Sequence, residues 1–160
     1  MSNNKSIRIT VASCLLFVSM VAGLFVYTTV SPKELTAAEY KQIGFYKLVR
    51  TRQLNNFELI EGGNKFSNND LKGAWDVLFL GFASCPDMCP MTMKKMVMAN
   101  DKLSEEASSK VNFRIISVDP SRDTPEKMQK YAKAFNQSFT GITGDIEVIY
   151  KLATDLTLPF

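Results

Sequence analysis

The sequence contains no histidine, and it has only three cysteines and one tryptophan. Without histidine the chain lacks the nitrogen ligands that a stable Cu(II) site prefers, and three cysteines are too few for the four ligands of a structural zinc site. An excess of charge is also missing. Beyond Lys5 and Arg8, 17 Lys and Arg stand against 16 Asp and Glu, which gives no support to nucleic-acid binding. The sequence has no repeats, and its composition fits one packed domain.

Charged residues are absent from the whole segment 9–30. At about 1.5 Å per residue, a helix of this length spans roughly 33 Å, close to the ~30 Å hydrocarbon core of a bilayer. Lys5 and Arg8 precede the segment, and positive residues stay on the cytoplasmic side. We therefore predict a single-pass anchor in the inner (cytoplasmic) membrane, with the remaining domain facing the periplasm or an equivalent exterior space.

Two other interpretations of the N-terminus are weaker. A cleaved signal peptide is disfavoured because the apolar run is long for such a signal and no small-x-small cleavage site follows it. Residues 11–13 before Cys14 resemble a lipoprotein processing box, but most of the apolar run follows Cys14, which is the reverse of the expected order. Cys14 is interpreted as a residue of the membrane helix, which leaves two working thiols.

The chain is expected to have four parts. They are a cytoplasmic N-terminus (1–8), a transmembrane anchor (9–30), a tether (31–50) and a folded domain (51–160). The tether is polar and charged with scattered apolar residues, which is typical of a linker or a short helix.

Strand and helix patterns alternate along the folded domain. We expect a hairpin over 57–66, strands over 75–82, 111–118 and 139–142, and helices over 90–103, 124–135 and 144–156. The strand 75–82 is apolar with little alternation, which is typical of a strand covered on both faces of a parallel sheet. This order of elements, with right-handed crossovers, predicts an α/β sandwich.

Cys85 and Cys89 lie between the expected strand 75–82 and the following helix. A thiolate at a helix N-terminus is stabilised by the helix dipole and by free N–H groups, so we expect a lowered pKa, especially for Cys89. If the loop curls helically, the two Cα atoms lie about 6 Å apart, within the ~4.4–6.8 Å range of a disulfide.

The two cysteines can therefore either oxidise to a disulfide or bind copper, because two soft thiolates select Cu(I) over hard metals. A purely structural disulfide is the plainer alternative. It is disfavoured, since a bridge that closes so small a loop stabilises the fold weakly.

Methionines and aspartates are further candidates for metal binding. Five of the eight methionines lie beside the thiols: Met88, Met91, Met93, Met96 and Met98. Met93, Met96 and Met98 have the spacing of core residues on a helix, so only Met88 is a candidate copper ligand. Asp119 and Asp123 suit a hard metal ion, but both precede turn or cap residues, and we favour turn chemistry for them.

The chain resembles the Sco/SenC family of membrane-anchored, thioredoxin-like copper proteins that assist cytochrome c oxidase assembly. Four blocks carry the resemblance: 79–90 (FLGFASCPDMCP), 116–126 (ISVDPSRDTPE), 139–144 (FTGITG) and, more weakly, 56–59 (NFEL). The resemblance implies that Cys85 and Cys89 are two of three copper ligands. The third, a histidine in a downstream D-H segment, has no counterpart in this sequence.

The family's last hairpin and final helix would follow residue 160. The resemblance therefore implies a thioredoxin-like sandwich that lacks these elements, with residues 77–82 as an exposed apolar edge.

These observations together predict a metallochaperone rather than an enzyme. Cu(I) would be held by Cys85 and Cys89 and passed to the copper-site subunit of a respiratory oxidase, with a copper donor or thiol reductant as further partner. Two alternatives stay open: a thiol-disulfide oxidoreductase that reduces partner cysteines, and an inactive fragment. Three residues between the cysteines, rather than the two of thioredoxin motifs, argue mildly against the oxidoreductase.

Overall fold

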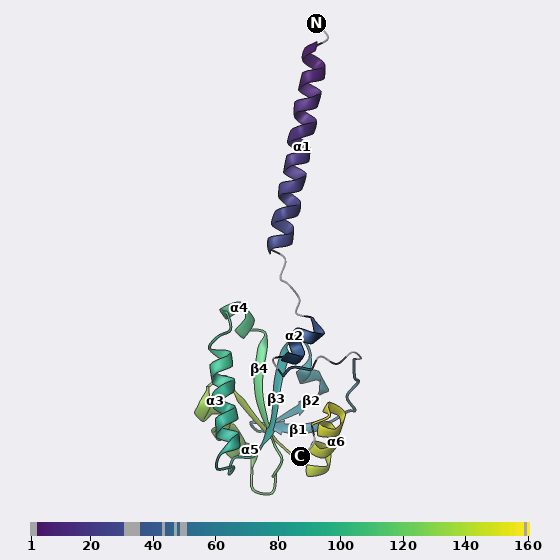
Figure 1. Cartoon of the computed structure of the whole chain (residues 1–160). Coiled ribbons are helices and arrows are strands. Elements are labelled where there is room, and N and C mark those ends of the chain that lie inside the picture. Colours follow the sequence, from purple (N-terminus) through teal and green to yellow (C-terminus); the bar gives the residue numbers. More distant parts are fainter. Residues whose placement is uncertain (1–2, 31–35, 43, 47, 49–50, 159) are drawn as a thin grey trace. The chain divides into compact units, whose positions relative to one another are not determined.

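The chain divides into two units, residues 1–50 and 51–160. The structure is a computed structural model that describes all residues except 1–2, 31–35, 43, 47, 49–50 and 159. The first unit contains helix α1 (Asn3–Val30) and helix α2 (Ala37–Gln42) (Figure 1). Residues Ile7–Thr29 of α1 are long and apolar enough to cross a membrane. The predicted N-terminus 1–8 and tether 31–50 fall partly outside the described residues.

Five strands of the second unit form one mixed sheet. They are β1 (Glu58–Glu61), β2 (Asn64–Ser67), β3 (Trp75–Gly81), β4 (Val111–Ser117) and β5 (Thr140–Thr143), in the order β2-β1-β5-β4-β3. Strands β3, β4 and β5 run parallel, whereas β1 pairs antiparallel with both of its neighbours. Gly62 and Gly63 join β1 to β2 with φ angles of 53° and 92°, which glycine adopts without steric cost. The predicted hairpin is confirmed.

Helices cover both faces of the sheet. The second unit contains α3 (Met88–Asn100), α4 (Glu105–Ser108), α5 (Pro125–Phe135), α6 (Ile146–Leu156) and the 3-10 helix η1 (Asn68–Leu71). Alternate residues of β4 enter two separate cores: Ile115 packs with α3 and α5, and Ile116 packs with α6. Figure 1 shows α3 and α6 on opposite sides of the strands. The short helix α4 was not predicted.

Local sequence signals account for two helix starts. Thr124 caps α5, its side chain accepting a hydrogen bond from the N–H of Lys127 at 3.3 Å, and Pro125 occupies the first turn, as the sequence predicts. Asp145 caps α6 in the same way. Helix α3 begins at Met88, before the predicted start at Pro90, so Cys89 lies inside the helix.

Strand β3 lies at the edge of the sheet rather than between two neighbours. Among the described residues only β4 pairs with it, and Trp75 is 77% exposed. Leu78 and Leu80 pack against the core that contains Ile116, and Phe79 packs against the core that contains Ile115, so apolar residues of β3 contact both cores, as the pattern predicts. The exposed edge implied by the resemblance also agrees with the structure. Because periodicity records apolar content and not neighbours, it did not distinguish a central strand from an apolar edge strand.

A buried cation fixes β3 against β4. The guanidinium of Arg114 on β4 pairs with Asp76 on β3 at 2.8 Å and with Glu61 on β1 at 3.1 Å. The same group lies 5.0 Å from the ring centroid of Phe66. These contacts satisfy a charge that is costly to bury alone, and they hold in register the strand that leads into the cysteines.

Candidate thiol site

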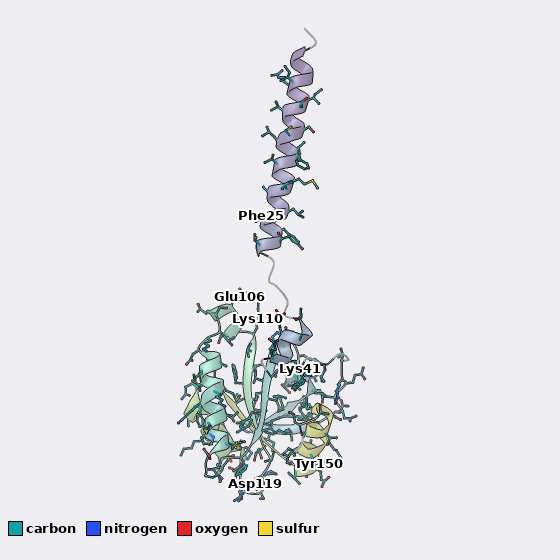
Figure 2. All side chains as sticks on the ribbon, viewed as in Figure 1. Phe25, Lys41, Glu106, Lys110, Asp119 and Tyr150 are labelled. Atoms are coloured by element: carbon teal, nitrogen blue, oxygen red, sulfur yellow. The ribbon has the colours of Figure 1, made fainter. Side chains whose placement is uncertain are left out.

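The two cysteines follow the carboxyl end of a parallel strand. Strands β3 and β4 end side by side, with Gly81 opposite Ser117, so the loops after both strands meet at one edge of the sheet. Figure 2 shows Asp119, in the loop after β4, at this end of the second unit. Glu106 and Lys110, an ion pair of 2.9 Å, lie at the other end. Ligand sites in open parallel sheets gather at such carboxyl ends.

The sulfur of Cys85 lies at the N-terminus of α3. The N–H of Cys89 donates a hydrogen bond to Cys85 Sγ at 3.4 Å, and the N–H groups of Asp87 and Met88 also act on this sulfur. Asp87, at the N-cap position, makes no capping hydrogen bond of its own. The sulfur of Cys85 thus takes the place of a capping oxygen. Both thiols are free.

The two thiols differ in acidity. The Cys89 thiol and the Cys89 N–H donate hydrogen bonds to Cys85, and these hold the pKa of Cys85 below its ordinary value. Burial, with Cys85 as a second cause, raises the pKa of Cys89, which is only 5% exposed. The expectation that Cys89 especially has a lowered pKa is wrong, because Cys89 lies within the helix against the sheet. Cys85 is therefore the more acidic and the more accessible of the two thiols.

Cys89 packs directly on the backbone of β3. A Cβ atom placed on Gly81 would lie 3.0 Å from Cys89 Sγ and 2.9 Å from the ring of Phe79. Only a residue without a side chain leaves room for both groups. Gly81 is therefore a site residue that sequence reasoning missed, although its place two residues after Phe79 at the end of an apolar strand was visible.

A buried carboxylate holds the loop before Cys85. Asp123 is 1% exposed, and its Oδ2 accepts hydrogen bonds from the N–H of Ala83 at 2.9 Å and from Ser117 Oγ at 2.8 Å. Lys127 pairs with Asp123 Oδ1 at 2.9 Å and also donates to Ser84 Oγ at 3.2 Å. Burial alone would raise the pKa of Asp123, but the hydrogen bonds from Lys127, Ala83 and Ser117 outweigh it and lower that pKa. Sequence reasoning assigned Asp123 to a turn and missed this role.

The other aspartate of the loop has a local role. Asp119 accepts a hydrogen bond from Ser121 Oγ at 2.8 Å and forms an ion pair with Arg122, while its own N–H donates to Ser117 Oγ at 3.1 Å. These bonds confirm the turn interpretation for Asp119. In the part of the chain that the structure describes, no cluster of three His, Cys, Asp or Glu residues is arranged to hold a metal ion.

Methionines around the site fall into two groups. Met93 and Met96 are buried between α3 and the sheet, as predicted. Met98 is 61% exposed, so its assignment to the core is wrong. Met88 and Met91 are also exposed.

A tyrosine lies near the thiols from α5. The buried hydroxyl of Tyr131 has no hydrogen-bond partner among the described residues. Burial, followed by the charges of Cys89 and Cys85, raises the pKa of Tyr131 to about 12. The ring packs edge-on to Phe135 with centroids 5.3 Å apart, so Tyr131 presents a neutral phenol beside the site.

Comparison with known proteins decides the family. The family model described as SCO1/SenC matches residues 48–159. The chain belongs to the SCO1/SenC family. The sco1 protein of Schizosaccharomyces pombe is 31% identical over 142 residues, which cover 88% of this chain and 54% of that protein. The chain spans about half or less of the length of the curated relatives that it matches first.

Solved Sco structures share the fold of this SCO1/SenC chain. The crystal structure of Arabidopsis thaliana ScoI with copper bound has a TM-score of 0.60 and 36% identity, covering 64% of this chain and 65% of that one. BsSco, described as having a disulfide switch and as a member of the Sco family of cytochrome c oxidase assembly proteins, has a TM-score of 0.56 and 25% identity, covering 68% and 66%. The predicted thioredoxin-like α/β class is confirmed.

Proposed function

We propose that this SCO1/SenC protein is a membrane-anchored copper chaperone that binds Cu(I) through Cys85 and Cys89. The observation that carries the proposal is the pairing of one accessible, acidic thiol with one buried thiol at the carboxyl end of β3. Two soft sulfur donors fit Cu(I), and no cluster of oxygen ligands competes for a hard ion in the described residues. Copper in the Arabidopsis thaliana ScoI crystal structure supports the same cargo here.

The difference in acidity gives an order of binding. Cys85 is the first donor, because its pKa is the lower of the two and its side chain is partly exposed. Cys89 keeps its proton until the ion arrives and then releases it, since only the thiolate binds a metal. Release to a partner follows the reverse order: Cys89 is reprotonated in its buried position, and the last bond is exchanged at the accessible Cys85.

We infer that the recipient is the copper centre of cytochrome c oxidase. The support is that BsSco, with the same fold, is described as a member of a family of oxidase assembly proteins. The apolar segment of α1 supports a single-pass anchor that keeps the domain beside such a membrane-bound recipient. The charge distribution before the segment supports a domain on the periplasmic or equivalent exterior side.

A thiol-disulfide oxidoreductase is the second candidate, favoured by the hydrogen bond between the Cys89 and Cys85 thiols. The Cys85 thiolate attacks a partner disulfide and forms a mixed disulfide, releasing one partner thiolate. The Cys89 thiolate, after losing its proton to solvent, attacks Cys85 Sγ and releases the second partner thiolate. The partner gains two electrons, and Cys85 and Cys89 end as a disulfide that an external dithiol must reduce.

Cu(I) competition titrations of the full chain in detergent micelles test the proposal. A chromophoric Cu(I) chelator competes with wild type, Cys85→Ser, Cys89→Ser and the matched control Cys14→Ser. We expect each of the first two variants to lose tight binding and Cys14→Ser to bind as wild type. Tight Cu(I) binding that survives in both Cys85→Ser and Cys89→Ser would contradict the proposal. Rapid disulfide exchange without copper affinity would establish the oxidoreductase instead.

A further inference from the structure

We propose that the thioether of Met88 is a third ligand to the Cu(I) ion held by Cys85 and Cys89. The inference rests on the proposed function and adds a residue to its site. Three features of Met88 support it: its place on the backbone beside the thiols, its exposure, and the chemistry of its sulfur.

The backbone puts Met88 directly beside both thiols. Its N–H is one of the groups that act on Cys85 Sγ, and the next residue is Cys89. Met88 is the first residue of α3, and Cys85 lies three positions earlier, in the loop that leads into the helix. The side chain of Met88 therefore leaves the backbone at a position next to the two thiols.

The side chain of Met88 is not used in the core. It is 75% exposed, whereas Met93 on the same helix is fully buried. An exposed apolar side chain contributes little hydrophobic stabilisation to the fold. Methionine has three rotatable bonds, so the exposed thioether can turn toward an ion at the thiols without disturbing packed neighbours.

The chemistry of the thioether fits the ion. Thioether and thiolate sulfur are both soft donors that select Cu(I). The thioether is neutral and carries no proton. It adds a bond to the complex without changing its charge or the number of protons released on binding. Loss of Met88 should therefore weaken binding by the same factor at every pH, which distinguishes it from loss of a thiol.

Helix geometry singles out Met88 among the exposed methionines. At about 100° per residue, Met88 lies about 100° around the helix from Cys89 and Met91 about 200°, and Cys89 faces the sheet. Met91 therefore points away from the thiols. Met98 lies ten positions further along α3, about 15 Å from Met88, and is similarly exposed, which makes it a matched control.

The test measures Cu(I) affinity and copper coordination on the full chain in detergent micelles. Wild type, Met88→Leu, Met88→Gln and Met98→Leu are titrated with Cu(I) against a chromophoric chelator at two pH values. We expect both Met88 variants to bind at least about tenfold more weakly, by the same factor at both pH values, and Met98→Leu to bind as wild type. Copper X-ray absorption should show three sulfur neighbours in wild type and two in Met88→Leu.

Each outcome decides between the two proposals. If Cys85→Ser and Cys89→Ser abolish binding while both Met88 variants keep wild-type affinity and coordination, the Met88 proposal fails and the chaperone proposal stands. If the Cys variants bind normally, the chaperone proposal fails. Equal weakening in Met98→Leu would show a general effect on α3 and would also overturn the assignment. Using two Met88 replacements of different polarity ensures that one poorly folded variant does not decide the result.

Discussion

Replacement of Asp123 by alanine is the sharpest perturbation of the loop that presents the thiols. The change removes the carboxylate that accepts hydrogen bonds from Ala83 N–H and Ser117 Oγ, at 2.9 and 2.8 Å, and that pairs with Lys127. Hydrogen bonds to a charged group contribute about 1.5–3 kcal/mol each. The ion pair adds little, since the Lys127 side chain is 43% exposed.

Two features of the site reduce the expected loss. Ser117 Oγ still accepts a hydrogen bond from Asp119 N–H, and Ala83 is only half-buried, so water can reach its N–H in the variant. We therefore expect Asp123→Ala to lower the free energy of unfolding by about 2–4 kcal/mol. Guanidinium denaturation of the full chain in micelles, followed by near-ultraviolet circular dichroism, measures this loss.

Asp119→Ala is the matched control, because its partner Arg122 is exposed and the pair belongs to the loop surface. The control should lose no more than about 1 kcal/mol. A loss for Asp123→Ala that is equal to or smaller than that of Asp119→Ala would refute the reasoning. It would show that the buried carboxylate does not hold the loop.

Ionisation of Asp123 makes the free energy of unfolding depend on pH in the acid range. The pKa of Asp123 is lower in the folded state than in the unfolded chain, where it is about 3.9. The contribution of its carboxylate to the free energy of unfolding is therefore complete above the unfolded pKa and is lost as the pH falls through the folded pKa. The stability difference between wild type and Asp123→Asn should therefore shrink below about pH 4. A difference that stays constant from pH 7 to pH 3 would show that ionisation of Asp123 is not involved.

Three further predictions follow from the site and from the sheet edge. Gly81→Ala should cost about 1–3 kcal/mol by overpacking and should weaken Cu(I) binding, because the added methyl meets Cys89 Sγ; unchanged denaturation and copper titrations would contradict this. Iodoacetamide should alkylate Cys85 before Cys89 at every pH below 8, as peptide mass mapping can show; preferential labelling of Cys89 would reverse the assigned order of acidity. The isolated region 45–160 should be insoluble or molten because β3 is an exposed edge; a sharp, cooperative thermal transition in a monomer would refute this.

Elements with strong local signals were predictable from the sequence. The Gly62–Gly63 turn, the Thr124 cap with Pro125, and the apolar strands before and after the cysteines depend on residues adjacent in the chain, and the structure has all of them. The same holds for the juxtaposition of Cys85 and Cys89, which a strand-loop-helix order brings together.

Features that depend on tertiary contacts were not predictable in the same way. Helix α3 starts before Pro90, which buries Cys89 and reverses the expected order of thiol acidity. Asp123 looks like a turn residue in sequence, and only the meeting of the loops after β3 and β4 brings it to the N–H of Ala83. Met98 lies two positions after Met96, about 200° around α3, so it faces away from the core, whereas Val97 and Leu103 pack against that core.

Copper X-ray absorption on the full chain, loaded with one equivalent of Cu(I) in micelles, tests the central claim most directly. We expect a mononuclear ion bound by sulfur alone, with a loss of sulfur neighbours in Cys85→Ser and Cys89→Ser and an unchanged spectrum in Cys14→Ser. Coordination dominated by nitrogen or oxygen, or a spectrum that is the same in wild type and in both thiol variants, would contradict it.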